Sequence, residues 1–454
     1  MRRTVHLDEL PYHPDSCELL ERVRELPGAA LLDSSAPHSA SGRYDIITAA
    51  PASDGLPPPP TVAGERRCRD YFDTLGRYLR ERYGGIRPAA EDIPFCGGLL
   101  GHLPYDLGNG LHGVTHPGAA AGPPEAHSTL QAYDWCLLQD HLLRWAVLVA
   151  LPWVSPSQRR DLLARLRTPR AGSGAGFALE TPFASNLSEA HYRQAFDRIQ
   201  AYIRDGDCYQ VNLAQRLCAR YSGDPWSAYR ALRQVAAAPF SAYLETADGG
   251  AVLSLSPERF LALHGHHVET SPIKGTRPRH ADPHRDRQAA DELLASDKDR
   301  AENLMIVDLL RNDLGRSCVP GSIHVDRLFE LQSFPTVHHL VSTVIGELRS
   351  DRQSTDLLRD SFPGGSITGA PKRRAMEIIA ELEPSRREVY CGSILYISAD
   401  GRMDSNIAIR TLLCREGEIR CWAGGGIVAD SRWQQEYQET FDKVGRLLAT
   451  LEQL

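Results

Sequence analysis

The sequence predicts an α+β fold in which large antiparallel β-sheets are covered by helices. The 454 residues are 42% apolar and 24% charged, the composition of a globular protein with a substantial core. The C-terminal half alternates pairs of strands with helices. Short glycine turns of hairpin type join the paired strands, which argues against a doubly wound parallel sheet.

Strands are predicted where alternating or continuous apolar residues lie between turn signals. The run 145–154 is the most apolar of the chain and, interrupted by Pro152, is typical of a buried strand. The later strands are paired around turns at Gly265, Asp400-Gly401 and Glu416-Gly417. They are predicted at 259–263, 267–271, 389–398, 403–415 and 418–423.

Helices are predicted where apolar residues recur at three- and four-residue spacing. Residues 187–206 have this spacing, with Ser188 as a predicted N-cap and Gly206 as a predicted C-cap. The other predicted helices cover 299–310, 370–382 and 432–451, the last with one apolar face.

Two loops divide the chain. Residues 57–60 are four consecutive prolines, and 169–177 alternates glycine with small residues. We take the second loop as the boundary. The predicted organisation is an N-terminal part at 1–170, a linker at 171–184 and a C-terminal part at 185–454.

Charge and cysteine content exclude several classes of function. With 51 Lys and Arg against 58 Asp and Glu, the net charge of −7 disfavours binding to nucleic acid. The run 145–154 is about half of the ~20 residues needed to cross a membrane, and no signal peptide is visible. The ten cysteines form no C-x-x-C pair, so we expect reduced thiols and a cytoplasmic protein.

A glycine-rich loop at 362–372 leads into a predicted helix, and Pro371 suits its first position. Gly364 and Gly369 have the spacing of a phosphate-binding loop, but Ala370-Pro371 occupies the place where Lys-Ser or Lys-Thr must follow. Nucleotide binding is therefore disfavoured. The loop either presents amides to another anion or needs its glycines only for turns.

A second glycine run, Gly424 to Gly426, ends the last predicted strand. It either lets a ligand approach the backbone or forms a tight turn. On the following helix, Glu436, Glu439 and Lys443 share one face, which usually means a solvated surface. If these carboxylates meet Glu302 of another helix in a cleft, they suit Mg²⁺.

Lys274 follows a predicted strand, in Pro272-Ile273-Lys274-Gly275-Thr276. A lysine at a strand end is most often a surface charge. In a cleft, desolvation and a nearby cation lower its pKa and leave a nucleophilic amine.

These motifs, together and in this order, resemble the chorismate-utilising enzymes, and among them the branch that aminates chorismate at C4. The resemblance is strong from about residue 185 to the end and weaker before it. Its segments are 31–34, 43–46, 97–101, 206–215, 256–260, 272–276, 302–309, 339–342, 362–372, 424–426 and 436–440. It implies two large packed antiparallel sheets with helices outside and a cleft near the sheet ends.

The resemblance also assigns roles. Glu302 and Glu439 match Mg²⁺ ligands, Glu258 matches a general acid, and Lys274 matches a lysine that adds to ring carbon C2 before ammonia attacks C4. The product would be 4-amino-4-deoxychorismate, a precursor of 4-aminobenzoate and folate. The positions that match substrate-binding places are Gln210, Thr276, His339, Thr368, Tyr396, Arg410, Gly425 and Lys443.

Two positions distinguish the sister activities. Gln210 stands where water-adding relatives have a lysine, and Lys274 stands where anthranilate synthases usually have alanine. Anthranilate synthase component I remains the alternative, and a non-catalytic regulator that binds chorismate or tryptophan is a second one. The four catalytic positions argue against the regulator because none of them is degenerate.

Partners follow from what the chain lacks. No Gly-x-Cys-x-Gly motif of a glutamine amidotransferase is present, so a separate amidotransferase subunit is expected to supply ammonia. Residues near Ser34, Arg43 and Tyr44 resemble the tryptophan pocket of relatives, in which the amino acid inhibits or is a buried structural ligand. Tryptophan is therefore a candidate ligand.

Overall fold

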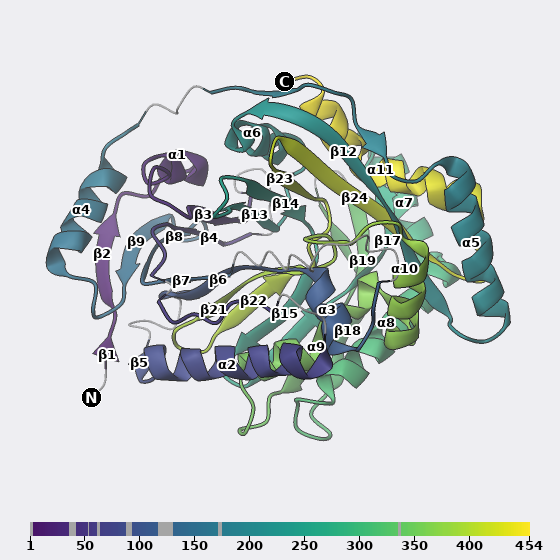
Figure 1. Cartoon of the computed structure of the whole chain (residues 1–454), viewed down its shortest axis with the longest axis horizontal. Coiled ribbons are helices and arrows are strands. Elements are labelled where there is room, and N and C mark those ends of the chain that lie inside the picture. Colours follow the sequence, from purple (N-terminus) through teal and green to yellow (C-terminus); the bar gives the residue numbers. More distant parts are fainter. Residues whose placement is uncertain are drawn as a thin grey trace.

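Two large antiparallel sheets form the centre of the molecule, as predicted (Figure 1). The computed structural model describes residues 3–35, 42–52, 54–60, 64–87, 93–116, 130–170, 175–334 and 337–454. Part of the predicted linker, 171–174, lies outside these ranges. In both sheets the strands from before the linker form a block at one end that pairs directly with the strands from after it, so the two parts of the chain share one core.

The larger sheet has thirteen strands in the described ranges. Strands β11 (Ala184–Ser185) and β20 (Gly369–Ala370) pair with β12 outside the main order. The main order is β10 (Phe177–Leu179), β12 (Gln210–Gly223), β24 (Glu418–Ile427), β23 (Thr411–Arg415), β14 (Ala251–Ser256), β13 (Phe240–Glu245), β3 (Ala30–Asp33), β4 (Tyr44–Thr48), β8 (Trp135–Asp140), β9 (Trp145–Ala150) and β2 (His6–Leu10).

The second sheet has nine strands in the same ranges. Strand β18 (His324–Ser333) pairs with β19 beside the main order. That order is β17 (Ile273–Pro278), β19 (Val337–Glu347), β16 (His267–Ser271), β15 (Arg259–His264), β22 (Met403–Asn406), β21 (Ser393–Ser398), β6 (Gly98–Leu103) and β7 (Gln131–Tyr133). A separate parallel pair joins β1 (Arg3–Thr4) to β5 (Ile86–Arg87).

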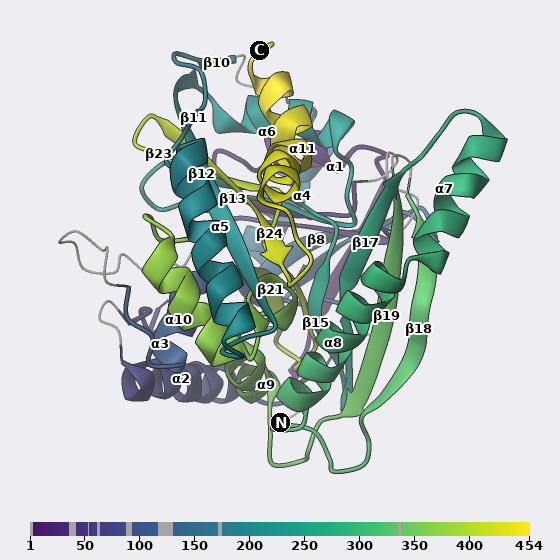
Figure 2. The same cartoon turned by 90° about the vertical axis from the view of Figure 1, so that its right-hand side faces the viewer.

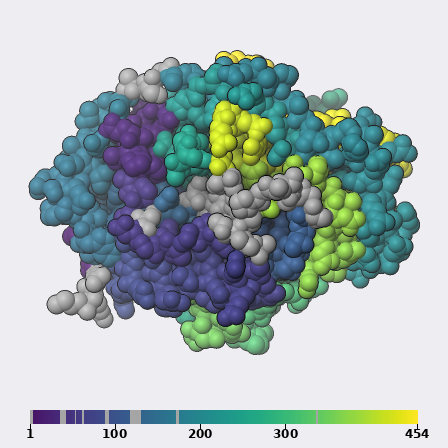
Figure 3. All heavy atoms as spheres, in the orientation of Figure 1, coloured from purple at the N-terminus to yellow at the C-terminus, as the bar shows by residue number. Residues whose placement is uncertain are grey.

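Helices lie outside the sheets, as predicted (Figure 2). Helix α11 packs on β24, and α8 packs on β17 and β19. Atoms of the first hundred residues cover the lower part of the face in Figure 3, where α2 runs in Figure 1. The helices are α1 (Ser16–Glu21), α2 (Glu65–Tyr83), α3 (Tyr105–Leu111), α4 (Pro156–Arg167), α5 (Glu189–Arg204), α6 (Pro225–Val235), α7 (Pro283–Ala295), α8 (Asp297–Leu314), α9 (Ser354–Ser361), the 3₁₀ turn η1 (Gly365–Ile367), α10 (Lys372–Leu382) and α11 (Trp433–Leu451).

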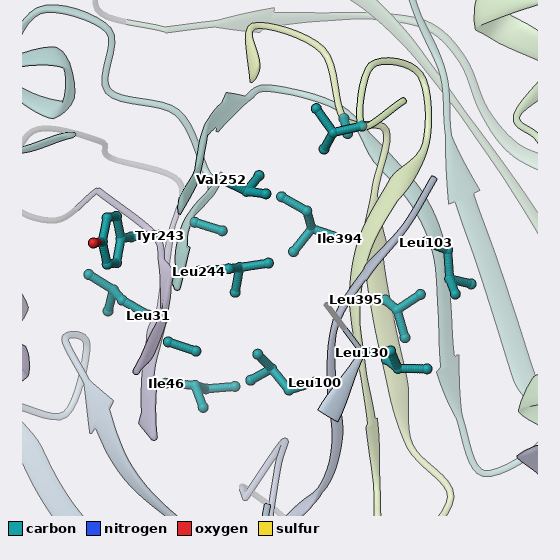
Figure 4. Packing of buried hydrophobic residues seen from close by; sticks show 14 of the residues in the cluster. Leu31, Ile46, Leu100, Leu103, Leu130, Tyr243, Leu244, Val252, Ile394 and Leu395 are labelled. Carbon is teal, nitrogen blue, oxygen red and sulfur yellow. The ribbon is translucent and has the colours of Figure 1, made fainter. Parts of the chain in front are cut away.

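The core fills the space between the sheets. Leu31 and Leu244 of the larger sheet point toward Leu100 and Ile394 of the second sheet (Figure 4), and all four are buried. Burying a leucine or isoleucine side chain stabilises the fold by roughly 1.5–3 kcal/mol. Packing of this kind fixes the separation of the sheets and therefore the position of the loops at their ends.

Local signals place several elements as predicted. The Ser188 hydroxyl accepts a hydrogen bond from the His191 amide and caps α5, and Gly206 follows that helix with φ +82°. The turn between β23 and β24 has positive φ at both Glu416 and Gly417, as its tight hairpin requires.

Three predicted strand boundaries are wrong. The strand predicted at 403–415 is two strands, because the chain leaves the second sheet after Asn406 and enters the larger sheet at Thr411, through Arg410 at φ +50°. The strand predicted at 389–398 begins at Ser393, since 389–392 form a turn. The run Gly424 to Gly426 lies inside β24 and pairs with β12.

No helix within the described ranges is both long enough and apolar enough to cross a membrane. All ten cysteines lie in those ranges and none forms a disulfide.

Candidate active site

Most predicted site residues have other predicted site residues as near neighbours in the structure. The Lys274 amine interacts electrostatically with Glu258, Glu302, Glu439 and Lys443, which come from separate segments. Glu258 lies between β14 and β15, and Arg410 lies between β22 and β23. The other elements and their predicted residues are β12 with Gln210, β17 with Lys274 and Thr276, α8 with Glu302, β19 with His339, the end of η1 with Thr368, β24 with Gly425, and α11 with Glu439 and Lys443.

Lys274 is a partly buried amine on β17. Its Nζ donates a hydrogen bond of 3.2 Å to the carbonyl oxygen of Ser366. Burial lowers the pKa of Lys274, while the carboxylates of Glu302 and Glu258 oppose that shift. The amine is therefore biased toward the neutral, nucleophilic form.

Glu258 is a buried carboxyl group beside this amine. Burial raises its pKa, against the lowering effects of a hydrogen bond from Ser366 and the charge of Lys274. The Ser366 hydroxyl donates to Glu258 Oε1 at 2.6 Å. A carboxyl group with a raised pKa is suited to general acid catalysis.

Three further carboxylates gather between α8 and α11. Burial raises the pKa of Glu302 and of Glu436, and Glu439 raises both further by charge repulsion. Lys443 pairs with Glu439 at 2.7 Å, and Lys298 lies 3.9 Å from Glu302. Burial and mutual repulsion of carboxylates favour an added cation at this place.

Gly425 leaves room next to these carboxylates. A Cβ atom at Gly425 would lie 3.0 Å from Glu436 Oε2, 3.7 Å from Glu439 Oε1 and 3.8 Å from Lys443 Nζ. The β23 ladder with β24 ends at Leu412, so one edge of the glycine run has no strand partner in the described chain. A side chain at Gly425 would therefore fill space beside the acidic group.

In the part of the chain that the structure describes, the buried side chains of Arg410 and His339 are not paired with a carboxylate. Burial lowers the pKa of Arg410, and within the described residues no carboxylate pairs with its guanidinium. His339 is buried, and burial with the charge of Arg410 lowers its pKa to about 4, so its ring is neutral near pH 7. Its Nδ1 lies 2.9 Å from Thr276 Oγ1, while in the same ranges Nε2 has no partner. Such groups can bind an anionic ligand.

The side chains of Gln210 and Thr368 differ in whether they are free to contact a ligand. Both amide atoms of Gln210 are buried without a hydrogen-bond partner in the chain as described, and a Cβ at Gly426 would lie 2.7 Å from its Nε2. Thr368 is buried, and its hydroxyl donates to the carbonyl of Gly364 at 3.1 Å. Gln210 can therefore meet a ligand, whereas the Thr368 side chain holds its own loop.

Tyr396 lies elsewhere, in a cavity with the predicted tryptophan residues Ser34, Arg43 and Tyr44. The prediction that Tyr396 joins the substrate group is at odds with this placement, because β21 runs between β22 and β6 and carries Tyr396 to the cavity. The cavity has a volume of about 330 Å³ between the two sheets. Its remaining walls are Leu32, Asp33, Gly42, Ile46, Pro94, Pro239, Phe240, Ser241, Arg259, Ile394, Leu395, Asp404, Ser405 and Asn406.

A network of buried charges supports the cavity wall. Ser34 donates through its amide and its hydroxyl to Asp45, at 2.7 and 2.6 Å. Arg43 pairs with Asp140 at 2.7 Å and lies 4.6 Å from the centre of the Tyr44 ring. These contacts fix the polar wall before any ligand enters.

Comparison with known proteins identifies the family. Residues 56–449 match the family described as chorismate binding enzyme. The chain belongs to the chorismate binding enzymes. The match covers the second sheet and all the residues of the active-site group, whereas β2, β3 and β4 of the larger sheet lie before it.

Several chorismate binding enzymes are similar over nearly the whole chain. Aminodeoxychorismate synthase component 1 of Salmonella typhimurium is 46% identical, covering 98% of this chain and 97% of the relative, and that of Escherichia coli is 45% identical, covering 98% of each. Anthranilate synthase component 1 of Streptomyces coelicolor is 38% identical over 81% of this chain and 75% of its own. The solved anthranilate synthase component I of Streptococcus pneumoniae has a TM-score of 0.76 at 29% identity, covering 90% and 93%.

Two residues of this chorismate binding enzyme were not among the predicted site residues. The helical spacing placed Glu436 on one face with Glu439, but only Glu439 was predicted as a metal ligand; in the structure Glu436 lies beside Glu439 and Gly425. Ser366 contacts both Glu258 and Lys274, but the sequence around it shows only a glycine-rich loop and gives no signal for a role of this serine.

Proposed function

We propose that the chain aminates chorismate at C4 with ammonia to give 4-amino-4-deoxychorismate, as component I of an aminodeoxychorismate synthase. The observation that carries this proposal is Lys274, a partly buried amine that interacts electrostatically with the carboxyl groups of Glu258 and Glu302. The relatives at 45–46% identity bear that enzyme's name, which supports the same reaction.

In the first step the neutral amine of Lys274 forms a bond to ring carbon C2. Both conjugated ring double bonds shift, from C1=C2 and C5=C6 to C1=C6 and C4=C5, as the C4–O bond breaks. The hydroxyl leaves as water with a proton from Glu258. Lys274 is then a secondary ammonium bonded to C2 and Glu258 is ionised. The raised pKa of Glu258 and the lowered pKa of Lys274 favour the starting proton states.

In the second step ammonia forms a bond to C4. Both ring double bonds shift back to C1=C2 and C5=C6, the Nζ–C2 bond breaks, and Lys274 leaves as a neutral amine. The new ammonium group gives one proton to Glu258, which restores the acid. The balance is chorismate plus ammonia to aminodeoxychorismate plus water.

Mg²⁺ is the proposed cofactor. Glu302 and Glu439 would hold it, with Glu436 beside them, because these donors are carboxylate oxygens and their repulsion requires compensation. Among the described residues no group of three or more His, Cys, Asp or Glu side chains is arranged to hold a metal ion, so the proposal assigns only Glu302 and Glu439 as protein ligands. When bound, Mg²⁺ neutralises charge on the ring carboxylate.

The remaining residues orient the substrate. Arg410 can clamp a carboxylate bidentately, and His339 Nε2 and the Gln210 amide offer unpartnered polar atoms in the described chain. The proposed positioning set is completed by Thr276, Thr368 as part of the glycine-rich loop, Gly425 and Lys443. Together with Mg²⁺ these groups would attract a dianion to an acidic chain.

A separate glutamine amidotransferase subunit is the proposed source of ammonia. The "component 1" name of the relatives and the missing amidotransferase motif support it. For the cavity between the two sheets, which Tyr396 lines, we propose tryptophan as the ligand. Its volume of about 330 Å³ and its apolar and charged walls suit an aromatic amino acid.

The deciding experiment mixes the purified chain with chorismate, Mg²⁺ and ammonium, and then adds aminodeoxychorismate lyase. We expect 4-aminobenzoate. Formation of 2-aminobenzoate would instead assign anthranilate synthase, and no turnover would assign a regulator.

A further inference from the structure

Ser366 is in contact with both proposed catalytic groups. It lies in the middle of η1 and is buried. Its hydroxyl donates to Glu258 Oε1 at 2.6 Å, and its carbonyl oxygen accepts from Lys274 Nζ at 3.2 Å. One residue therefore holds the acid with its side chain and the nucleophile with its main chain.

Glu258 and Lys274 are near each other without pairing directly. Their charges interact, yet no ion pair within 4 Å joins them in the described structure. A direct pair would favour the carboxylate and the ammonium, the two forms that cannot begin the proposed reaction. Ser366 gives each group a neutral partner instead.

We propose that Ser366 is a positioning residue that aims the proton of Glu258 and the lone pair of Lys274 at the same substrate. This inference rests on the proposed amination. The Ser366 hydroxyl occupies Oε1 of Glu258, which leaves Oε2 to carry the acidic proton. One N–H of the tetrahedral amine points to the Ser366 carbonyl, so the lone pair points away from that carbonyl.

The loop around Ser366 is fixed by contacts that do not involve substrate. Arg387 donates to the carbonyl of Ile367 at 3.0 Å and also to the carbonyl of Asn212 on β12, at the same distance. A Cβ at Gly365 would lie 2.6 Å from Leu309 Cδ2, so α8 packs closely on the turn. The Ser366 hydroxyl and carbonyl are thereby held in place before substrate arrives.

Several groups besides Ser366 act on the carboxyl group of Glu258, and the test must separate their effects from that of the Ser366 hydroxyl. Lys274 and Lys443 act on it through their charges, Ile273 donates a backbone hydrogen bond to it, and the buried thiol of Cys391 is within its electrostatic reach. Of the contacts with Glu258, the Ser366 hydroxyl can be removed without changing any charge.

The test compares Ser366→Ala and Ser366→Cys with wild type in the full chain. Ser361→Ala is the matched control, because its buried hydroxyl has no partner in the described residues and Ser361 is the last residue of α9, directly before the same loop. Rapid quench and mass spectrometry measure the rate at which chorismate with Mg²⁺, and without ammonia, forms the Lys274 adduct. Difference infrared spectra measure the pH midpoint of the Glu258 carboxyl band, which is assigned by its absence in Glu258→Gln.

For Ser366→Ala we expect adduct formation to slow by about 10²-fold while KM for chorismate changes less than about 3-fold. The Glu258 midpoint should rise by about one unit, because its carboxylate loses a donor. Ser366→Cys keeps a side chain of similar size with a weaker donor, so its rate of adduct formation and its Glu258 midpoint should lie between those of Ser366→Ala and wild type. If Ser366→Ala does not fold, the Ser366→Cys variant provides the test.

A wild-type adduct rate in Ser366→Ala, a loss confined to KM, an unmoved midpoint, or an equal loss in Ser361→Ala would each overturn the inference. These outcomes are distinct from failure of the proposed function. In that case the wild-type chain itself would neither aminate chorismate nor form the adduct.

Discussion

Replacing Lys274 by arginine keeps a cation on β17 but removes a titratable amine. Nζ lies 3.2 Å from the Ser366 carbonyl, and its environment lowers the lysine pKa. The pKa of arginine lies at least about two units above the ordinary lysine pKa of about 10.4, so at a given pH an ordinary lysine has roughly 10² times more of its neutral form. The lowered pKa widens this difference, so Lys274→Arg should lose at least ~10²-fold in kcat.

The assay for Lys274 has two parts. Steady-state formation of 4-aminobenzoate, coupled through the lyase, gives kcat and KM. Incubation with chorismate and Mg²⁺ but no ammonia should give wild type an adduct of chorismate mass minus one water on the 272–276 peptide, which ammonia discharges. Lys298→Arg, at an exposed lysine on α8, should stay within about 3-fold of wild type. Near-normal turnover in Lys274→Arg, or an adduct on another peptide, would leave Lys274 as a binding residue only.

Four other expectations concern the metal, the nitrogen source, acid stability and the buried charges. Glu302→Ala and Glu439→Ala should each raise the Mg²⁺ concentration needed for half-maximal activity at least ~10-fold, while circular dichroism shows an unchanged fold. Near-normal activity at low Mg²⁺ in both variants would remove these residues from the metal site. The isolated chain should use ammonium but not glutamine, and glutaminase activity in the pure chain would contradict a separate subunit. His339 has a pKa of about 4 in the folded protein and about 6.5 in the unfolded chain, so between these pH values it binds a proton only on unfolding. Lowering the pH from 7 to 5 should therefore reduce the free energy of unfolding by about 2 kcal/mol through this residue. Urea titrations of His339→Asn should lack this pH-dependent loss, and the same pH dependence in the variant as in wild type would refute the assignment. Arg387→Met should destabilise the folded protein by about 3–5 kcal/mol, because it leaves Glu383 buried without its cation. Thermal unfolding of the double variant Arg387→Met/Glu383→Met should show that part of this stability is recovered. Additive losses of stability would mean that the two residues are not coupled.

The sequence predicts the elements whose signals are local. The cap at Ser188 and the hairpin turn at Glu416-Gly417 depend on nearest neighbours, and both are confirmed. The strand at 403–415 is wrong because apolar alternation is the same on both sides of Arg410, while the sheet to which each half belongs is set by packing with distant strands. Local pattern carries no information on that choice.

The same distinction explains the site. Glu258, Lys274, Glu302 and Glu439 could be named from motifs, and the structure brings them within electrostatic reach of one another. The placement of Tyr396 could not be anticipated, since either face of β21 is compatible with a substrate role until the cavity between the sheets is seen.

The two sites are joined by the chain itself. Glu258 belongs to the active-site group, and the next residue, Arg259, lines the second cavity and pairs with Asp404 at 3.1 Å. From Asp404 the chain passes Ile407, whose amide donates to the Glu258 carbonyl at 3.0 Å, and reaches Arg410 three residues later. Asp404 therefore connects the wall of the cavity to the backbone segment that holds Glu258 and Arg410. Because a close-packed interior transmits a displacement to its packed neighbours, a substitution that moves Asp404 is expected to shift that segment as well.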